Sequence, residues 1–143
     1  TQKDLYGVGV VAEIIKVLEL PDNTTNVILQ GKACFSLDRI TAEKPYLRAE
    51  VTMLDEIMPK PDDKEFEALV LSIKDLTFDM LQKMGEGARE MTFAIKNIGE
   101  PAYLVNFLCC NTPIESYVKQ NMLDERNLVK RGYMLYGILS KEA

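Results

Sequence analysis

Residues 7–31 constrain the fold of this chain more than any other stretch. They read GVGVVAEIIKVLELPDNTTNVILQG, two apolar segments rich in β-branched residues with Pro-Asp-Asn-Thr at 21–24 between them. Asn tolerates a positive φ, and Asp and Asn both hydrogen-bond their own backbone, so Asp22-Asn23 suits a two-residue hairpin turn. The stretch therefore predicts a β-hairpin.

Residues 10–20, taken alone, leave strand and helix open. Their apolar side chains recur at a helical spacing, with charged side chains between them. The apolar stripe comprises Val10, Val11, Ile14, Ile15 and Leu18. The density of Val and Ile, and the turn that follows, favour a strand. In the expected hairpin Leu20 pairs with Thr25. Val17 then faces Ile28.

Two further segments, residues 32–38 and 46–53, alternate apolar and polar side chains with period two. That period is typical of half-buried strands. Together with the hairpin they predict four consecutive strands in an antiparallel meander. The meander ends at residues 55–63, DEIMPKPDD, because the prolines stop a strand and no helix begins until Asp62 or Asp63 caps one.

From residue 64 onward, apolar side chains repeat with the helical period of about 3.6 residues. The first predicted helix carries two apolar stripes, so it is expected to be covered on two sides, and Gly85 is expected to end it. The first stripe is Phe66, Leu69, Val70, Ile73, Thr77, Met80 and Met84, and the second is Leu71, Phe78 and Leu81.

Further helices are expected after it. One spans about residues 88–98, and Pro101 opens the next at its first helical position, where the missing N–H costs nothing. The sequence Thr-Pro-Ile-Glu at 112–115 has the form of a capping box and predicts another start. Asp124 is expected to open the last helix. The helix after the capping box is expected to bury Ile114, Tyr117, Val118 and Met122.

The predicted fold class is α+β, because a run of strands precedes a run of helices. Residues 1–60 are expected to form a β-rich subdomain, an antiparallel meander that is like part of a β-barrel and is incomplete at its N-terminus. Residues 61–143 are expected to form an all-α bundle subdomain of about five helices.

The sequence contains no candidate catalytic residues. The chain has no His, which excludes Ser-His and Cys-His pairs and most zinc sites. Its glycine-rich stretches lack the other residues of nucleotide-binding loops. A cluster of four carboxylates could in principle bind a cation. The favoured interpretation is that their negative charge complements the positive end of a helix dipole. The cluster is Asp62, Asp63, Glu65 and Glu67. We therefore expect no catalytic residue, no cofactor and no metal.

Composition also restricts the partners. The net charge of −5 disfavours a phosphate backbone, and we interpret the one tight basic pair, Lys130-Arg131, as a solvated helix face. An RNA-binding module on a small β-barrel-like fold is the alternative function, although the chain lacks an aromatic and basic platform for it. No apolar run approaches the ~20 residues that cross a membrane. Cys34, Cys109 and Cys110 are expected to be reduced, largely buried thiols.

The pattern within residues 7–31 resembles the amino-terminal, substrate-binding domain of Lon, the ATP-dependent protease La. It consists of Gly-x-Val-Ala-x-Ile, then Pro-Asp-x-Thr, then Val-Ile-Leu-x-Gly. The matching positions are Gly9, Val11, Ala12, Ile14, Pro21, Asp22, Thr24, Val27 and Gly31. Asn23 stands where the family usually has Gly, and Asn is the next best residue for a left-handed backbone. A second, looser match comprises Lys119, Gln120, Met122, Leu123 and Arg131.

This resemblance implies a non-catalytic domain that engages unfolded or damaged proteins and helps to organise a hexamer in the cytoplasm. It implies that the ATPase module and the Ser-Lys dyad of such a serine protease lie in a part absent from this chain. Members of the family begin with further strands that this sequence lacks. We therefore expect an open β edge through which the chain dimerises with a second copy.

Substrate contacts are expected next to the proline-rich segment, where apolar side chains are least able to be buried. The predicted contact residues are Leu54, Ile57 and Met58. The chain has seven methionines, and flexible thioethers adapt to apolar partners of varied shape.

Overall fold

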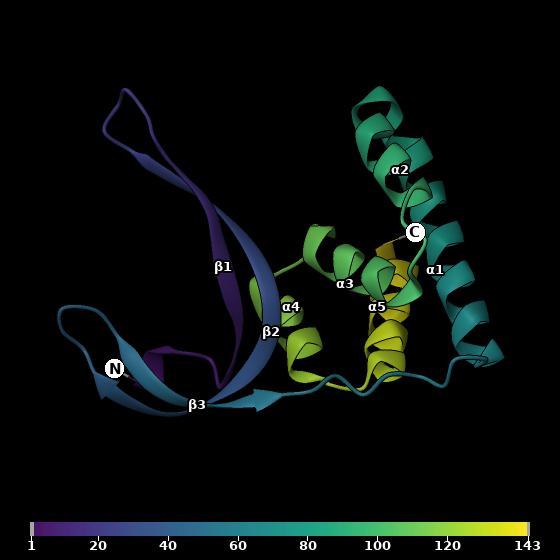
Figure 1. The fold of residues 1–143 in the computed structure, drawn as a ribbon. Helices are drawn as coiled ribbons and strands as arrows, with labels where there is room; N and C mark the ends of the chain where they lie inside the picture. The colour runs from purple at the N-terminus through teal and green to yellow at the C-terminus, as the bar shows by residue number, and fades with distance from the viewer. Residues whose placement is uncertain (1, 143) are drawn as a thin grey trace. The chain divides into compact units, whose positions relative to one another are not determined.

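A three-stranded sheet and a group of five α-helices follow one another along the chain (Figure 1). The computed structural model describes residues 2–142. Its internal contacts divide the chain after Asp55 into two compact units, residues 1–55 and 56–143. Strands precede helices, so the α+β class predicted from the sequence is confirmed.

The β unit is an antiparallel meander in the order β1-β2-β3. After a short 3-10 helix at Gln2–Asp4, its strands are β1 (Val8–Glu19), β2 (Thr25–Ala42) and β3 (Arg48–Leu54). The meander thus has three strands rather than the predicted four, because β2 continues through Gly31, where a strand end was expected. The pairing shifts register between Val11 and Ala12 at this point. Such a bulge bends a strand pair without ending it.

The hairpin turn contains three residues rather than two. The backbone N of Leu20 donates to the O of Thr24 at 2.8 Å, and the N of Asn23 donates to the O of Leu20 at 3.1 Å. Asn23 has φ 68°, the left-handed conformation expected of it. A type I turn followed by a left-handed residue is the usual three-residue hairpin loop. Leu20 therefore pairs with Thr24 and not with Thr25.

Pairing beyond the turn is shifted by one residue from the prediction, and Val17 lies opposite Val27. A second irregularity between Ile14 and Lys16 makes Ile15 the extra residue of a bulge. Because of this bulge, Ile14 and Val17 lie on the same face of β1 although they are three residues apart. The bulge thus accounts for the helix-like spacing in the sequence, and the strand interpretation is confirmed.

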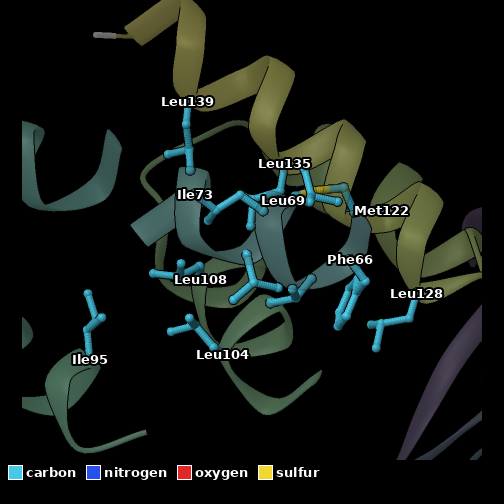
Figure 2. Close-up of a cluster of buried hydrophobic side chains, with 12 residues drawn as sticks. Phe66, Leu69, Ile73, Ile95, Leu104, Leu108, Met122, Leu128, Leu135 and Leu139 are labelled. Carbon is cyan, nitrogen blue, oxygen red and sulfur yellow. The ribbon is translucent and has the colours of Figure 1, made fainter. Parts of the chain in front are cut away.

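The helical unit has a core to which all five helices contribute (Figure 2). The helices are α1 (Lys64–Met84), α2 (Arg89–Lys96), α3 (Pro101–Asn111), α4 (Ser116–Asp124) and α5 (Leu128–Glu142), with a 3-10 turn at Gly85–Ala88 between α1 and α2. Figure 2 shows Ile73 of α1 beside Leu135 and Leu139 of α5. Within residues 2–142, no helix is both long enough and apolar enough to cross a membrane.

Helix α1 begins and ends where the sequence predicts. Asp63 caps it by accepting a hydrogen bond from the N of Phe66 at 3.1 Å, and Gly85 ends it with φ 75°. The first apolar stripe is buried from Phe66 to Thr77. The second stripe is not covered along its length, because Leu71 is 60% exposed. The expectation of cover on two sides is therefore wrong at Leu71, whereas Phe78 and Leu81 are half-buried against the core.

Helix α4 begins later than predicted. Thr112 donates its hydroxyl to the O of Leu108 at 2.6 Å, and this bond ties it to the end of α3. No capping box forms, and α4 begins at Ser116 without a side-chain cap. Tyr117, expected to be buried, is exposed.

Helix α5 starts at a different cap from the one predicted. The Oδ1 of Asn127 accepts a hydrogen bond from the N of Lys130 at 3.2 Å, whereas Asp124 is the last residue of α4. Asn and Asp are equally good caps, so local sequence does not decide between the two positions.

The cysteines form no disulfide, and they differ in exposure. Cys109 is half-buried, its Sγ donates to the Sδ of Met122 at 3.5 Å, and burial raises the pKa of its thiol to about 11. Cys110 is exposed, so the expectation of a buried thiol is wrong there.

Candidate binding surface

Residues 12–31 form a two-stranded ribbon that no other described strand extends. Strand β3 pairs with β2 only between Cys34 and Ala42, so the half of β2 nearest the turn has β1 as its only neighbour. In Figure 1 this ribbon is the purple and blue hairpin that carries the turn. Every residue of β1 from Val10 onward is exposed.

Four large apolar side chains lie together on one face of this ribbon. Ile14 lies opposite Leu29, and Val17 lies opposite Val27. Cross-strand partners project from the same face, so the two pairs form one apolar surface, the ribbon face. The exposed fractions of Ile14, Val17, Val27 and Leu29 are 63, 55, 46 and 58%. Soluble proteins seldom leave such apolar surface open unless it meets a partner.

Polar groups lie near both ends of the ribbon. Lys32 and Glu13 form an ion pair at 3.1 Å at the base of the ribbon. At the turn, Asp22 Oδ1 accepts the hydroxyl of Thr24 at 2.5 Å and its backbone N at 3.1 Å. Both hydrogen bonds lower the pKa of Asp22, and the bond from the hydroxyl has the larger effect. This side chain is therefore charged at neutral pH.

The sequence analysis did not single out the ribbon face as a candidate surface for substrate contact. It predicted an open β edge that meets a second copy, and it placed substrate contact at Leu54, Ile57 and Met58. The signal was present nonetheless, because a two-stranded hairpin with apolar residues on a broad face needs a further layer to bury them.

The predicted contact residues fall in both units. Leu54 is the last residue of β3 and is half-buried. Ile57 and Met58, in the helical unit, are 50 and 54% exposed. The backbone of Ile57 forms a parallel bridge with Asn127, and Met58 lines a surface cleft of about 950 Å³ beside Tyr133. Their role in substrate contact stays a prediction.

The acidic residues at the start of α1 act within the helical unit. Asp63 is the cap of α1, and Glu65, in its first turn, accepts the hydroxyl of Tyr133 at 2.5 Å, a bond that raises the pKa of this tyrosine. Among residues 2–141, whose side chains the structure describes, no three His, Cys, Asp or Glu side chains are grouped as metal ligands would be.

Arg131 carries a charge into the core of the helical unit, where it is only 3% exposed. Its guanidinium donates to Glu56 Oε1 and to Asn106 Oδ1, at 2.7 Å each. It also donates to the backbone O of Met122 at 2.9 Å and to that of Glu125 at 2.7 Å. One side chain thereby joins α5 to α3, to the end of α4 and to the segment before α1.

This arrangement gives the second resemblance pattern a structural explanation. Lys119 donates to the O of Cys110 at 2.7 Å, Met122 is fully buried, and Arg131 holds the helix ends together. The interpretation of Lys130-Arg131 as a solvated face is wrong for Arg131, and only Lys130 is exposed. Only one residue of this basic pair, Lys130, is therefore accessible to an RNA phosphate, which weakens the alternative of an RNA-binding module.

Comparison with known proteins identifies the same family along the whole chain. A family model described as the ATP-dependent protease La (LON) substrate-binding domain matches residues 1–141. A Lon protease of Parabacteroides distasonis is 46% identical over 140 residues, which are 98% of this chain and 17% of that protein. A Lon protease of Porphyromonas gingivalis is 44% identical over 97% of this chain and 17% of its own length. The chain thus spans only a small part of these relatives.

Solved structures show the same fold. The N-terminal domain of a Mycobacterium avium complex Lon protease superposes with a TM-score of 0.77 over 96% of this chain and 72% of that one, at 23% identity. A Lon N-terminal domain protein from Xanthomonas campestris gives a TM-score of 0.58 over 92% of this chain and 68% of its own, at 17% identity.

Proposed function

Since the chain belongs to the family of ATP-dependent protease La (Lon) substrate-binding domains, we propose that it holds unfolded or damaged proteins for such a protease. The ribbon face makes the contact. Cleavage of the substrate belongs to another part of the parent protein, in which the family resemblance implies a Ser-Lys dyad. The observation that carries this proposal is the exposure of Ile14, Val17, Val27 and Leu29 on one surface.

Unfolded chains differ from folded ones in exposing apolar side chains and unpaired backbone groups, and the ribbon offers a partner for both. Its apolar face contacts side chains without regard to their order, because the hydrophobic effect is non-directional. Strand β1 lies at the edge of the sheet, so an extended segment can add to it as a further strand. Backbone pairing of this kind also tolerates most sequences.

Replacing the most exposed cross-strand pair, in the double variant Ile14→Thr and Leu29→Thr, tests the proposal. Threonine keeps the β-propensity of both strands but removes the larger apolar surface. We expect the affinity for reduced, carboxymethylated α-lactalbumin, measured by fluorescence anisotropy, to fall about tenfold, the equivalent of roughly 1.4 kcal/mol of lost apolar contact.

The matched control is the variant Tyr46→Thr and Leu47→Thr, which also removes two exposed apolar side chains from the β unit, where they are 63 and 56% exposed. Its affinity should equal that of the unchanged chain. Equal losses in the two variants would mean that the ribbon face has no special part in binding.

We also propose that the edge of β1 supports self-association, as a second copy presents the same apolar strand. Edge strands pair readily with one another. Substrate and second copy then compete, so sedimentation velocity should show a concentration-dependent dimer that carboxymethylated α-lactalbumin dissociates. A monomer at every concentration would contradict self-association while leaving substrate binding untouched.

A further inference from the structure

A groove of about 760 Å³ opens in the helical unit between the end of α1 and α2, which lie side by side in Figure 1. Its apolar lining includes Phe78 and Leu81 of α1 and Phe93 of α2. Phe93 is 70% exposed, a large cost for an aromatic side chain on a surface that meets only water. This groove belongs to a different unit from the ribbon face.

Two cations flank the exposed aromatic ring. Arg89 and Lys96 line the groove together with one carboxylate, Glu86, so its charged lining is positive on balance. The two cations lie four residues before and three residues after Phe93 on the same helix. Residues at i, i+4 and i+7 share one face of a helix, and at 1.5 Å per residue the two cations are about 10 Å apart along its axis. Both are exposed, and among residues 2–141, whose side chains the structure describes, neither side chain forms an ion pair or a hydrogen bond.

The apolar lining continues along α1. Leu71 lies two turns before Phe78 and is 60% exposed, and these two residues belong to the stripe that the sequence marks as a second buried face. A helix with a second apolar stripe normally packs against another element on that side. Among the described residues, no element covers Leu71.

We propose that this groove is the docking site for an amphipathic helix of a partner protein, with acidic residues at positions i and i+7 and large apolar residues at i+3 and i+4. The spacing mirrors that of Arg89, Phe93 and Lys96, so each carboxylate meets one cation while the apolar pair enters the groove. Helices that bind apolar grooves present anchors at this spacing. The site serves folded partners and does not depend on the ribbon face.

A designed peptide tests the docking site directly. The probe is a fluorescein-labelled, alanine-based helix of about 18 residues, long enough to be helical in water, with Glu at i and i+7, Leu at i+3 and Phe at i+4. A second probe carries Lys in place of both Glu residues. Fluorescence anisotropy with the complete chain should show binding of the Glu probe and at least about tenfold weaker binding of the Lys probe, because like charges repel across an interface.

Variants then locate the site. Arg89→Glu with Lys96→Glu should reverse the preference, so that the Lys probe binds the more tightly. Lys64→Glu is the control for charge, because Lys64 lies about 20 Å along α1 from the groove. Phe93→Ala should weaken the Glu probe about tenfold, as expected for a central aromatic anchor. Tyr117→Ala, which removes an equally accessible ring on α4, should not.

The outcomes separate this site from the ribbon face. The variant Ile14→Thr with Leu29→Thr should bind the Glu probe as the unchanged chain does, whatever its affinity for unfolded protein. No binding of the Glu probe at concentrations up to about 1 mM would overturn the docking site. So would equal affinity for both probes, a preference that the charge reversal leaves unchanged, or a loss of binding in the ribbon variant alone.

Discussion

Replacing Arg131 with methionine is expected to destabilise the helical unit by about 3 kcal/mol, the lower end of the range for breaking a buried ion pair from one side, because the Glu56 side chain is 31% exposed and water can reach it. Methionine fills much of the same volume but donates no hydrogen bond. Glu56 and Asn106 then lose their partner, and so do the backbone carbonyls at the end of α4. Urea unfolding followed by far-UV circular dichroism measures the loss.

The control for this variant is Arg126→Met. Arg126 is exposed, and removing an exposed charge typically changes stability by less than about 0.5 kcal/mol. Arg131→Lys keeps the charge but cannot reproduce the planar fork, so it should fall between the two. A stable Arg131→Met variant would show that the hydrogen bonds to this side chain are replaced by water at little cost.

A second large effect is expected at Ile73. Its side chain is fully buried among α1, α3 and α5, so Ile73→Ala leaves a cavity and should cost about 2–5 kcal/mol. Leu71→Ala, two residues away on the same helix, removes a side chain that is 60% exposed and should cost less than about 1 kcal/mol. Urea unfolding of the two variants compares the two stripes of α1 directly.

Equal costs at the two positions would mean that Leu71 is buried in solution, by a second copy or by the rest of the protein. Repeating the measurement at several protein concentrations separates these cases, because burial by a second copy makes stability depend on concentration. We expect unequal costs, and we expect the difference in cost between the two variants to stay the same at every protein concentration.

Local chemistry explains what the sequence predicted correctly. Asn23 takes the left-handed conformation that the turn requires, Asp63 caps α1, Gly85 ends that helix, and Pro101 is the first residue of α3. Each of these features depends on the conformational preference or hydrogen bonding of residues within one turn. Sequence alone contains that information.

The register of the hairpin could not be predicted in the same way. It depends on a three-residue loop rather than a two-residue loop, and on the bulge at Ile15. Backbone hydrogen bonds across the two strands determine both the loop length and the position of the bulge. The side chains are compatible with a two-residue or a three-residue loop. A shift of one residue changes which side chains share a face. The sequence therefore indicates that apolar side chains of the hairpin need cover, but not which four of them form the ribbon face.

Hydrogen-bond partners decided two of the remaining differences. Thr112 and Arg131 are residue types that usually lie at helix starts and on solvated faces, respectively. The carbonyl of Leu108 takes the hydroxyl of Thr112, and Glu56, 75 residues from Arg131, takes its guanidinium. The Thr112 bond is a local one, in which the hydroxyl reaches back one helical turn instead of capping the next helix. The Arg131 bond is a tertiary contact, which periodicity does not identify.

Photocrosslinking tests substrate contact at the ribbon face most directly. Benzoylphenylalanine is placed at Leu29 in one variant and at Tyr117 in another, two positions that are 58 and 61% exposed. Each variant is irradiated with reduced, carboxymethylated α-lactalbumin, and the crosslinked product is quantified. The account predicts efficient crosslinking from position 29 and little from position 117. Equal yields at the two positions, or a higher yield at 117, would contradict substrate binding by the ribbon.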